Sequence, residues 1–110
     1  MPYIDVSLSG VLAQETEQQL KSAFGKLIER IPGKTEDYLM VQFHDRCRLW
    51  FRGKNEEPNA MVNVMLYGKA GQADYQHLAD GILEALSQTA GVPVSNIYVK
   101  FEEVPNWFWG

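Results

Sequence analysis

Hydrophobic residues alternate with polar ones at the start of the chain. Ile4, Val6 and Leu8 stand at every second position, which is the period of a strand with one buried face. From about Gln14 the apolar spacing changes to that of a helix, and Gly33 is typical of a residue just beyond its end. The apolar stripe of this helix consists of Leu20, Phe24, Leu27, Ile28 and Ile31.

The start of this helix and the segment after it carry further signals. Thr16 and Gln19 have the spacing of a capping box, so we expect their side chains to close the first turn. A short apolar strand is predicted from Leu39 to Phe43. Residues 45–58 are polar except around Trp50, which predicts a loop that contains a minor strand.

The same order of elements is then predicted again. An apolar strand covers Ala60 to Tyr67, a turn covers residues 68–71, and a last strand covers Ile97 to Phe101. Between the turn and the last strand lies a helix that Gly91 ends. The apolar stripe of this helix consists of Tyr75, Leu78, Ala79, Ile82, Leu83 and Leu86.

One constant offset maps the first half of the chain onto the second without a gap. It carries Val6 onto Val64 and Leu20 onto Leu78, and it matches turn glycines as well. Because these identities fall at core and turn positions, we interpret the chain as two repeats, about residues 2–46 and 60–104. The sequence therefore predicts one α+β domain over residues 1–110, with two tandem β-α-β units, a four-stranded mixed sheet and both helices on one face.

The other face of this sheet has no cover of its own in the sequence. We expect it to carry Tyr, Met, Leu and Phe rather than charge, so that another subunit covers it in a closed homo-oligomer. Two apolar segments at the expected surface, 49–51 and 107–109, favour the same conclusion. The alternative is that these segments fold back onto their own subunit.

Composition and charge exclude several classes of function. Ten basic and 14 acidic residues give a net charge of −4, so we expect no nucleic-acid partner. Cys47 is the only cysteine, which excludes an internal disulfide and a cysteine-based zinc site. His44 and His77 are too few and too separated for a metal site, and we expect no cofactor.

No apolar run approaches the length of about 18 residues that spans a bilayer, so we expect no membrane partner. The first residues alternate rather than forming the apolar core of a signal peptide. We therefore expect a cytoplasmic protein, with export without a signal peptide left open.

Pro2 is the residue that points most directly to chemistry. An initiator methionine is commonly removed before a small residue, and its removal would leave Pro2 with a free secondary amine. The reference pKa of an α-amino group is about 8, and burial near a cation lowers it toward neutral pH. Lys34 at a helix-to-strand junction and Tyr67 at a strand end are expected near this amine. These groups would suit a carboxylate-bearing substrate with an acidic α-carbon.

These residues resemble the tautomerase superfamily, and specifically its macrophage migration inhibitory factor group. The resemblance covers nearly the whole chain through its length, the Met-Pro start and the duplicated β-α-β plan. Its most specific pieces are Pro2, Gly33-Lys34 followed by Tyr38 and the strand 39–43, Leu66-Tyr67-Gly68-Lys69, and Ile97-Tyr98-Val99.

The resemblance implies a homotrimer with pockets at its subunit interfaces, where Pro2 moves a proton between carbon and oxygen of phenylpyruvate-like α-keto acids or their enols. Lys34 and the backbone amide of Tyr67 would hold the substrate carboxylate. Tyr98 and Lys100 would come from the neighbouring subunit. The aromatic walls of the pocket would be Tyr38 and Trp109.

The chain also departs from the family pattern. Lys100 stands where the vertebrate cytokine has asparagine, and Tyr67 stands where it has a smaller isoleucine. Both changes bear on substrate choice. Two alternatives to a tautomerase stay open: a cytokine-like binding protein that signals through a protein receptor, and another proline-based reaction of the superfamily such as decarboxylation or dehalogenation.

Overall fold

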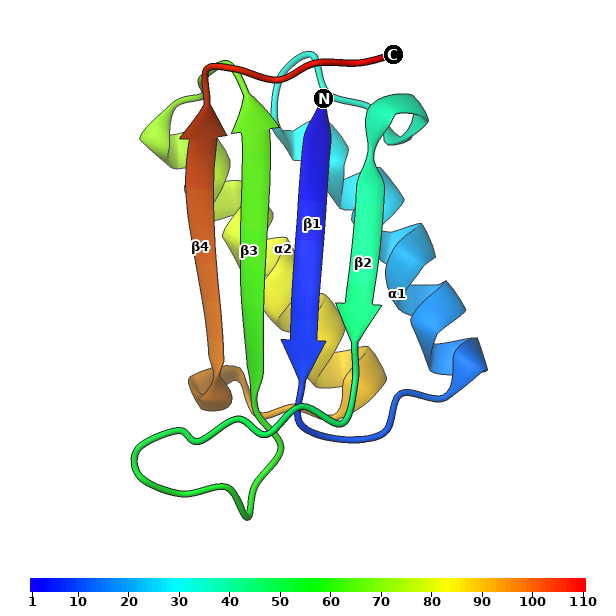
Figure 1. The fold of residues 1–110 in the computed structure, drawn as a ribbon, viewed down its shortest axis with the longest axis vertical. Helices are drawn as coiled ribbons and strands as arrows, with labels where there is room; N and C mark the ends of the chain where they lie inside the picture. Colours follow the sequence, from blue (N-terminus) through cyan, green and yellow to red (C-terminus); the bar gives the residue numbers. More distant parts are fainter.

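A computed structural model describes residues 1–110 as a four-stranded sheet with two long helices (Figure 1). The strands and helices follow the order expected from the repeated pattern. Their bounds are β1 Pro2–Leu8, α1 Gln14–Leu27, β2 Met40–His44, β3 Ala60–Tyr67, α2 Gln72–Ala90 and β4 Ile97–Val104. Three short 3-10 helices lie between them: η1 Ile28–Arg30, η2 Glu36–Tyr38 and η3 Val94–Asn96. The longest helix, α2, is not apolar enough to cross a membrane.

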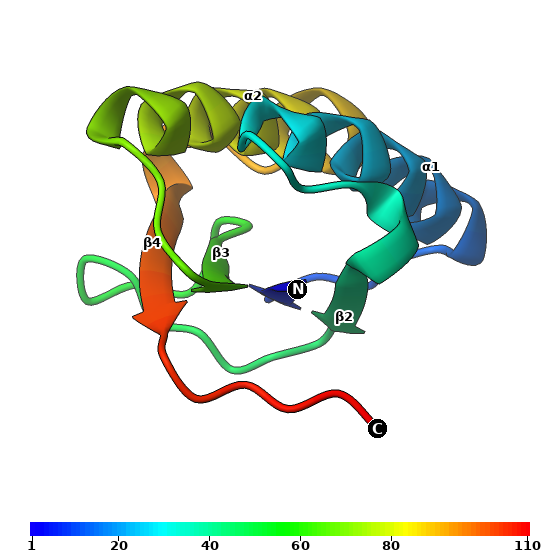
Figure 2. The same cartoon turned by 90° about the horizontal axis from the view of Figure 1, so that it is seen from above.

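The sheet has the mixed pairing that the sequence predicts. Its strand order is β2-β1-β3-β4, with β1 parallel to β2, β3 parallel to β4, and the two units joined by the antiparallel pair β1 and β3. Both long helices lie on the same side of the sheet (Figure 2). The prediction of an α+β fold with a four-stranded mixed sheet and one helix-covered face is therefore confirmed.

The core lies between the sheet and the helices. Alternate residues of the central strands, such as Val6 and Val64, are fully buried, and they belong to the same cluster as Leu20, Phe24 and Ile82 of the helices. Burying one such side chain stabilises a fold by about 1.5–3 kcal/mol. The alternate apolar side chains of the strands and the apolar stripes of α1 and α2 thus form one hydrophobic layer.

Of two signals expected at the helix ends, one is confirmed and the other is wrong. Gly91 follows α2 with a left-handed backbone, φ 71°, as expected of a glycine at a helix end. The capping box at Thr16 and Gln19 is wrong, because α1 already begins at Gln14 after Ala13, which has no side-chain cap. Two acidic residues in the first turn of α1 interact favourably with the helix dipole there.

The uncovered face differs from the expectation of an apolar surface. Strand register sets Gln42, Asp5, Asn63 and Lys100 side by side in one polar row across the middle of the sheet. The expectation was wrong because the aromatic residues Phe43 and Phe101 pack on the helix-covered face instead. Apolar side chains remain above and below the polar row, at Met40, Met61, Met65 and Tyr98.

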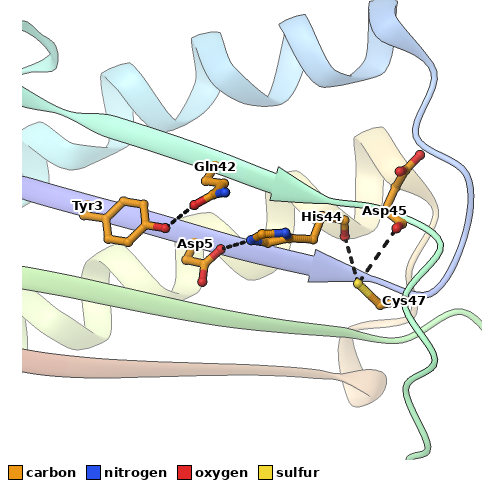
Figure 3. Close-up of polar contacts among 6 residues, drawn as sticks. All are labelled: Tyr3, Asp5, Gln42, His44, Asp45 and Cys47. Carbon is orange, nitrogen blue, oxygen red and sulfur yellow. Dashed lines mark hydrogen bonds and ion pairs between the residues drawn. The ribbon is translucent and has the colours of Figure 1, made fainter.

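Polar side chains on this face pair across strands (Figure 3). The Nε2 atom of His44 lies 3.0 Å from Oδ1 of Asp5, and the Tyr3 hydroxyl donates to the side-chain oxygen of Gln42. The Cys47 thiol donates to the His44 carbonyl at 3.3 Å. The polar groups at the β1–β2 side of this face are thus held by partners in the same chain.

The segment between β2 and β3 is a loop with a single bridge between Phe51 and Lys54, in place of the minor strand expected around Trp50. Trp50 is 68% exposed. The ring of Phe51 packs edge-on against Tyr98, with 5.2 Å between ring centroids. This apolar segment thus partly folds back onto its own chain, which is the alternative raised above.

Candidate active site

The first residue of the central strand β1 lies at one end of the sheet. Pro2 is buried there and is paired with Leu66 of β3. The N-terminus, the end of β3 and the C-terminal tail all lie at this end (Figure 1). Gly68 follows β3 with φ 93°, a backbone conformation that glycine adopts readily, and so turns the chain away from the N-terminus.

Two hydrogen bonds join the end of β3 to the N-terminus and to Lys34. The Tyr67 backbone N–H donates to the Met1 carbonyl oxygen at 3.1 Å, and the Lys34 ammonium donates to the Tyr67 carbonyl oxygen at 2.9 Å. Lys34 precedes η2 in the connection between α1 and β2. The strand pairing of β1 and the turn after α1 therefore bring a chain terminus, a cation and a backbone donor together.

The groups around the N-terminus lower the pKa of the Met1 amine below its ordinary value of 8.0. Burial of the amine is the largest cause, followed by the positive charge of Lys34 and a hydrogen bond with Lys34. With Met1 in place, the Pro2 nitrogen is an amide and is not basic. Removal of Met1 would place a secondary amine close to the same cation.

A cavity of about 400 Å³ opens beside Pro2. Its walls come from the N-terminal residues, from η2 with the start of β2, and from the C-terminal tail. The ten lining residues are Met1, Pro2, Tyr3, Asp37, Tyr38, Leu39, Met40, Trp107, Phe108 and Trp109. Tyr38 and Trp109 contact each other edge to face, with centroids 5.5 Å apart and an interplanar angle of 81°. The tail runs past the strand ends on the side of the sheet opposite the helices (Figure 2).

Five of the residues selected from the sequence lie at this end of the molecule. Pro2, Tyr38 and Trp109 line the cavity, while Lys34 and Tyr67 do not line it and are hydrogen bonded to each other at the end of β3. The structure thus brings the proposed base, the proposed carboxylate-binding groups and the aromatic walls together within one chain.

Tyr98 and Lys100 lie elsewhere in the chain. Tyr98 pairs with Met61, which lies opposite Ser7, five residues along β1 from Pro2. At about 3.3 Å per residue this is a separation of about 17 Å along the strand. Lys100 lies near the middle of the uncovered face, 3.4 Å from a Glu102 carboxylate oxygen. Neither residue can reach Pro2 of its own chain.

Sequence reasoning missed several parts of this site. The Met1 carbonyl occupies the Tyr67 N–H, and Asp37 and Met40 are among the further residues that line the cavity. Both lie within two residues of the selected Tyr38, and that adjacency was an available signal. The contact between Met1 and Tyr67 depends on strand pairing.

The arrangement suits proton transfer at carbon. It combines an amine terminus whose pKa is lowered, a cation, a backbone N–H that the Met1 carbonyl occupies, and an aromatic-walled cavity. A carbon acid that carries a carboxylate next to its reacting carbon fits these groups.

Comparison with known proteins yields one family for the entire chain. The family model described as macrophage migration inhibitory factor (MIF) matches residues 1–110. No curated protein sequence matches the chain significantly.

Solved structures give the same fold. Leishmania major MIF2 is 27% identical, with a TM-score of 0.91, and the alignment covers 99% of this chain and 93% of that one. The MIF homologue from Prochlorococcus marinus is 28% identical, with a TM-score of 0.88 and coverages of 98% and 95%. Pt0534, described as inactivated by 2-oxo-3-pentynoate, shares the fold at 18% identity with a TM-score of 0.83, and covers 93% of this chain and 85% of its own.

Proposed function

The chain belongs to the macrophage migration inhibitory factor family, and on that premise we propose that it is a keto–enol tautomerase of phenylpyruvate-like α-keto acids. The observation that carries this proposal is the position of Pro2, buried at the start of the central strand beside Lys34 and Tyr67. In this proposal Pro2 is the general acid and base, and the protein is an isomerase that needs no cofactor.

Met1 must leave before Pro2 can act. The amide nitrogen of Pro2 then becomes a secondary amine, and the surroundings that lower the pKa of the Met1 amine would keep it neutral over more of the pH range. Loss of Met1 also removes the carbonyl that now accepts from the Tyr67 N–H. One cleavage therefore uncovers both the base and a donor for the substrate.

The proton transfer needs only this amine. The neutral Pro2 nitrogen accepts the proton from the carbon beside the ketone, the C–H electron pair forms the carbon–carbon double bond, and the carbonyl π electrons move to the ketone oxygen, which takes the proton back from the Pro2 ammonium. In the reverse direction the neutral nitrogen accepts the enol O–H proton, and the resulting ammonium delivers it to carbon. General acid–base catalysis of this kind contributes about 10²–10⁴-fold in rate.

Lys34 and the freed Tyr67 N–H hold the substrate carboxylate in this proposal. A charged hydrogen bond from an ammonium group to a carboxylate is stronger than a neutral one. Lys34 now donates to the Tyr67 carbonyl, so its ammonium group is already held at the strand end. The aromatic rings of Tyr38 and Trp109 then contact the ring of the substrate.

Tyr98 and Lys100 enter the site from a second copy of the chain. Both lie on the uncovered face, where Tyr98 is 62% exposed. Their separation from Pro2 within one chain supports a homotrimer in which each pocket lies at a subunit interface. A free α-keto acid with an aromatic ring is the proposed substrate.

Ketonisation of phenylpyruvate enol tests this function. Protein whose intact mass confirms loss of Met1 should accelerate the reaction, and the Pro2→Ala variant prepared in the same way should lose most of that acceleration. Treatment with 2-oxo-3-pentynoate should add mass to the N-terminal peptide of the active protein. Equal rates for both proteins, or no rate in either, would overturn the proposal and favour a binding protein that signals through a receptor.

A further inference from the structure

Asp37 is the one charged side chain among the ten residues that line the cavity beside Pro2. It lies on η2, just before β2, and its carboxylate has no hydrogen bond or ion pair with any residue of the chain. An exposed acid on a cavity wall with free bonding capacity is available to a ligand.

The neighbouring acid on the same short helix lies in a different environment. The Glu36 carboxyl fills the space beside Gly25 of α1, where a Cβ atom would otherwise stand. Glu36 therefore packs on the helix layer, and it does not line the cavity. Two adjacent carboxylates of equal charge thus differ in their access to the site.

The surroundings of Asp37 are those that attract a cation. Tyr38, Trp107 and Trp109 line the same cavity, and aromatic faces bind ammonium and guanidinium groups through their quadrupole. The carboxylate on the cavity wall adds direct electrostatic attraction for a cation. Charge and aromatic faces therefore act in the same direction.

Lys34 and Asp37 are associated with strands on opposite sides of β1. Lys34 is bonded to the end of β3, whereas Asp37 precedes β2, and β1 lies between these two strands. Neighbouring strands are about 4.8 Å apart, so β2 and β3 are about 10 Å apart. A substrate of the size of an aryl keto acid spans that distance.

We propose that Asp37 determines substrate specificity by selecting α-keto acids that carry a positive charge at the end remote from the carboxylate. The inference rests on the proposed tautomerase function and adds the charge of the substrate to it. Lys34 would take the carboxylate, and Asp37 with the aromatic walls would take an amino or guanidino group. A negative charge at the remote end would be rejected.

Three substrates that differ only at the remote end test this selection. The enols of 4-(aminomethyl)phenylpyruvate, phenylpyruvate and 4-carboxyphenylpyruvate are compared in Met1-free wild type, Asp37→Asn and Glu36→Gln. In wild type, kcat/KM should rise about 5-fold from the neutral to the cationic substrate and fall about 5-fold to the anionic one. Asp37→Asn should reduce the difference among the three values, with the aromatic walls retaining part of the preference for the cationic substrate. Glu36→Gln should behave as wild type.

A binding measurement separates failure of this inference from failure of the proposed function. Benzylamine and benzyl alcohol are titrated into the same three proteins and followed by tryptophan fluorescence. Benzylamine should bind about 5-fold more weakly to Asp37→Asn than to wild type or Glu36→Gln, with benzyl alcohol unchanged. Equal benzylamine affinity in all three proteins would overturn the role of Asp37. Absence of phenylpyruvate turnover with that difference intact would overturn only the tautomerase function.

Discussion

The two ends of the sheet share one backbone plan and differ in chemistry. The offset that relates the halves of the sequence carries Met1 onto Asn59 and Ser9 onto Tyr67. The structure repeats the same hydrogen bond at both ends, since Tyr67 N–H donates to Met1 and Ser9 N–H donates to Asn59, each at 3.1 Å. The acceptor of the first bond is the terminal residue Met1, whereas the acceptor of the second, Asn59, lies within the chain.

The side chains around these two bonds explain why only one end is a candidate site. The positions equivalent to Pro2 and Lys34 are Ala60 and Val92, which are 6% and 3% exposed. Asn59 is also buried, and its side-chain amide donates to the Leu49 carbonyl at 3.0 Å. At the far end the positions equivalent to the base and the cation are thus buried apolar side chains, whereas the N-terminal end has an amine and a cation at these positions.

Replacing the cation at the N-terminal end should have the largest effect. Lys34→Met should lower kcat/KM for phenylpyruvate enol about 30-fold, equivalent to about 2 kcal/mol, because a charged hydrogen bond to the carboxylate is lost. The fold should be retained, since the Lys34 side chain bonds to an exposed carbonyl outside the hydrophobic core. Steady-state kinetics with a thermal melt measure both quantities. An unchanged kcat/KM would mean that another group binds the carboxylate.

Substitution of Val92, the position equivalent to Lys34 at the far end, should change stability and leave activity unchanged. Val92→Ala removes two buried methyl groups and should lower the free energy of unfolding by about 1.5 kcal/mol. Chemical denaturation gives this value, and kcat/KM of the folded variant should match wild type. A selective loss of activity would show that the two ends are not independent.

Removing an aromatic wall of the cavity should have a smaller effect. Tyr38→Leu loses the edge-to-face contact with Trp109 and the ring that faces the substrate, and contacts of this kind contribute about 0.5–1.5 kcal/mol. KM for phenylpyruvate should therefore rise about 5-fold with little change in kcat. For pyruvate, which has no ring, the variant and the wild type should be indistinguishable. An equal effect on both substrates would place the ring outside the substrate-binding wall.

The pH dependence of kcat/KM should shift in a defined direction when Lys34 is replaced. Lys34 contributes to lowering the pKa of the Met1 amine. If it acts in the same way on the Pro2 amine of Met1-free protein, Lys34→Met should raise the pKa of that amine. Because the neutral amine is the base, kcat/KM rises as pH increases through this pKa, and the variant should need a higher pH to reach its plateau. NMR titration of the terminal amine and a pH–rate profile test it. A pH–rate profile identical to that of wild type would mean that Lys34 does not affect the pKa of the base.

Much of the fold could be predicted because local pattern and global packing agree. The strand from Ala60 to Tyr67 has the expected bounds, and α2 is followed by Gly91 as expected. The start of α1 at Gln14 agrees with the expectation, but the expected capping box was wrong because Ala13, which cannot cap with its side chain, precedes the helix. The polar centre of the uncovered face was missed because it depends on the register between four strands, which aligns Asp5 and Lys100 with neutral residues.

The candidate site was only partly accessible from the sequence. Pro2, Lys34 and Tyr67 could be selected from a family resemblance and from element ends, and the structure brings them together. The masking of the Tyr67 N–H by Met1 depends on a hydrogen bond between residues far apart in the chain. The access of Asp37 to the cavity depends on the path of the C-terminal tail. The catalytic roles remain predictions.

The central claim is that the free amine of Pro2 is the base, and it is tested most directly by comparing two forms of one sequence. Methionine-retaining and methionine-free protein are separated, verified by intact mass, and assayed with phenylpyruvate enol at equal concentration. The account predicts that the methionine-retaining form is slower by about 100-fold or more, because its Pro2 nitrogen is an amide and its Tyr67 N–H is occupied. Equal rates for the two forms would contradict it.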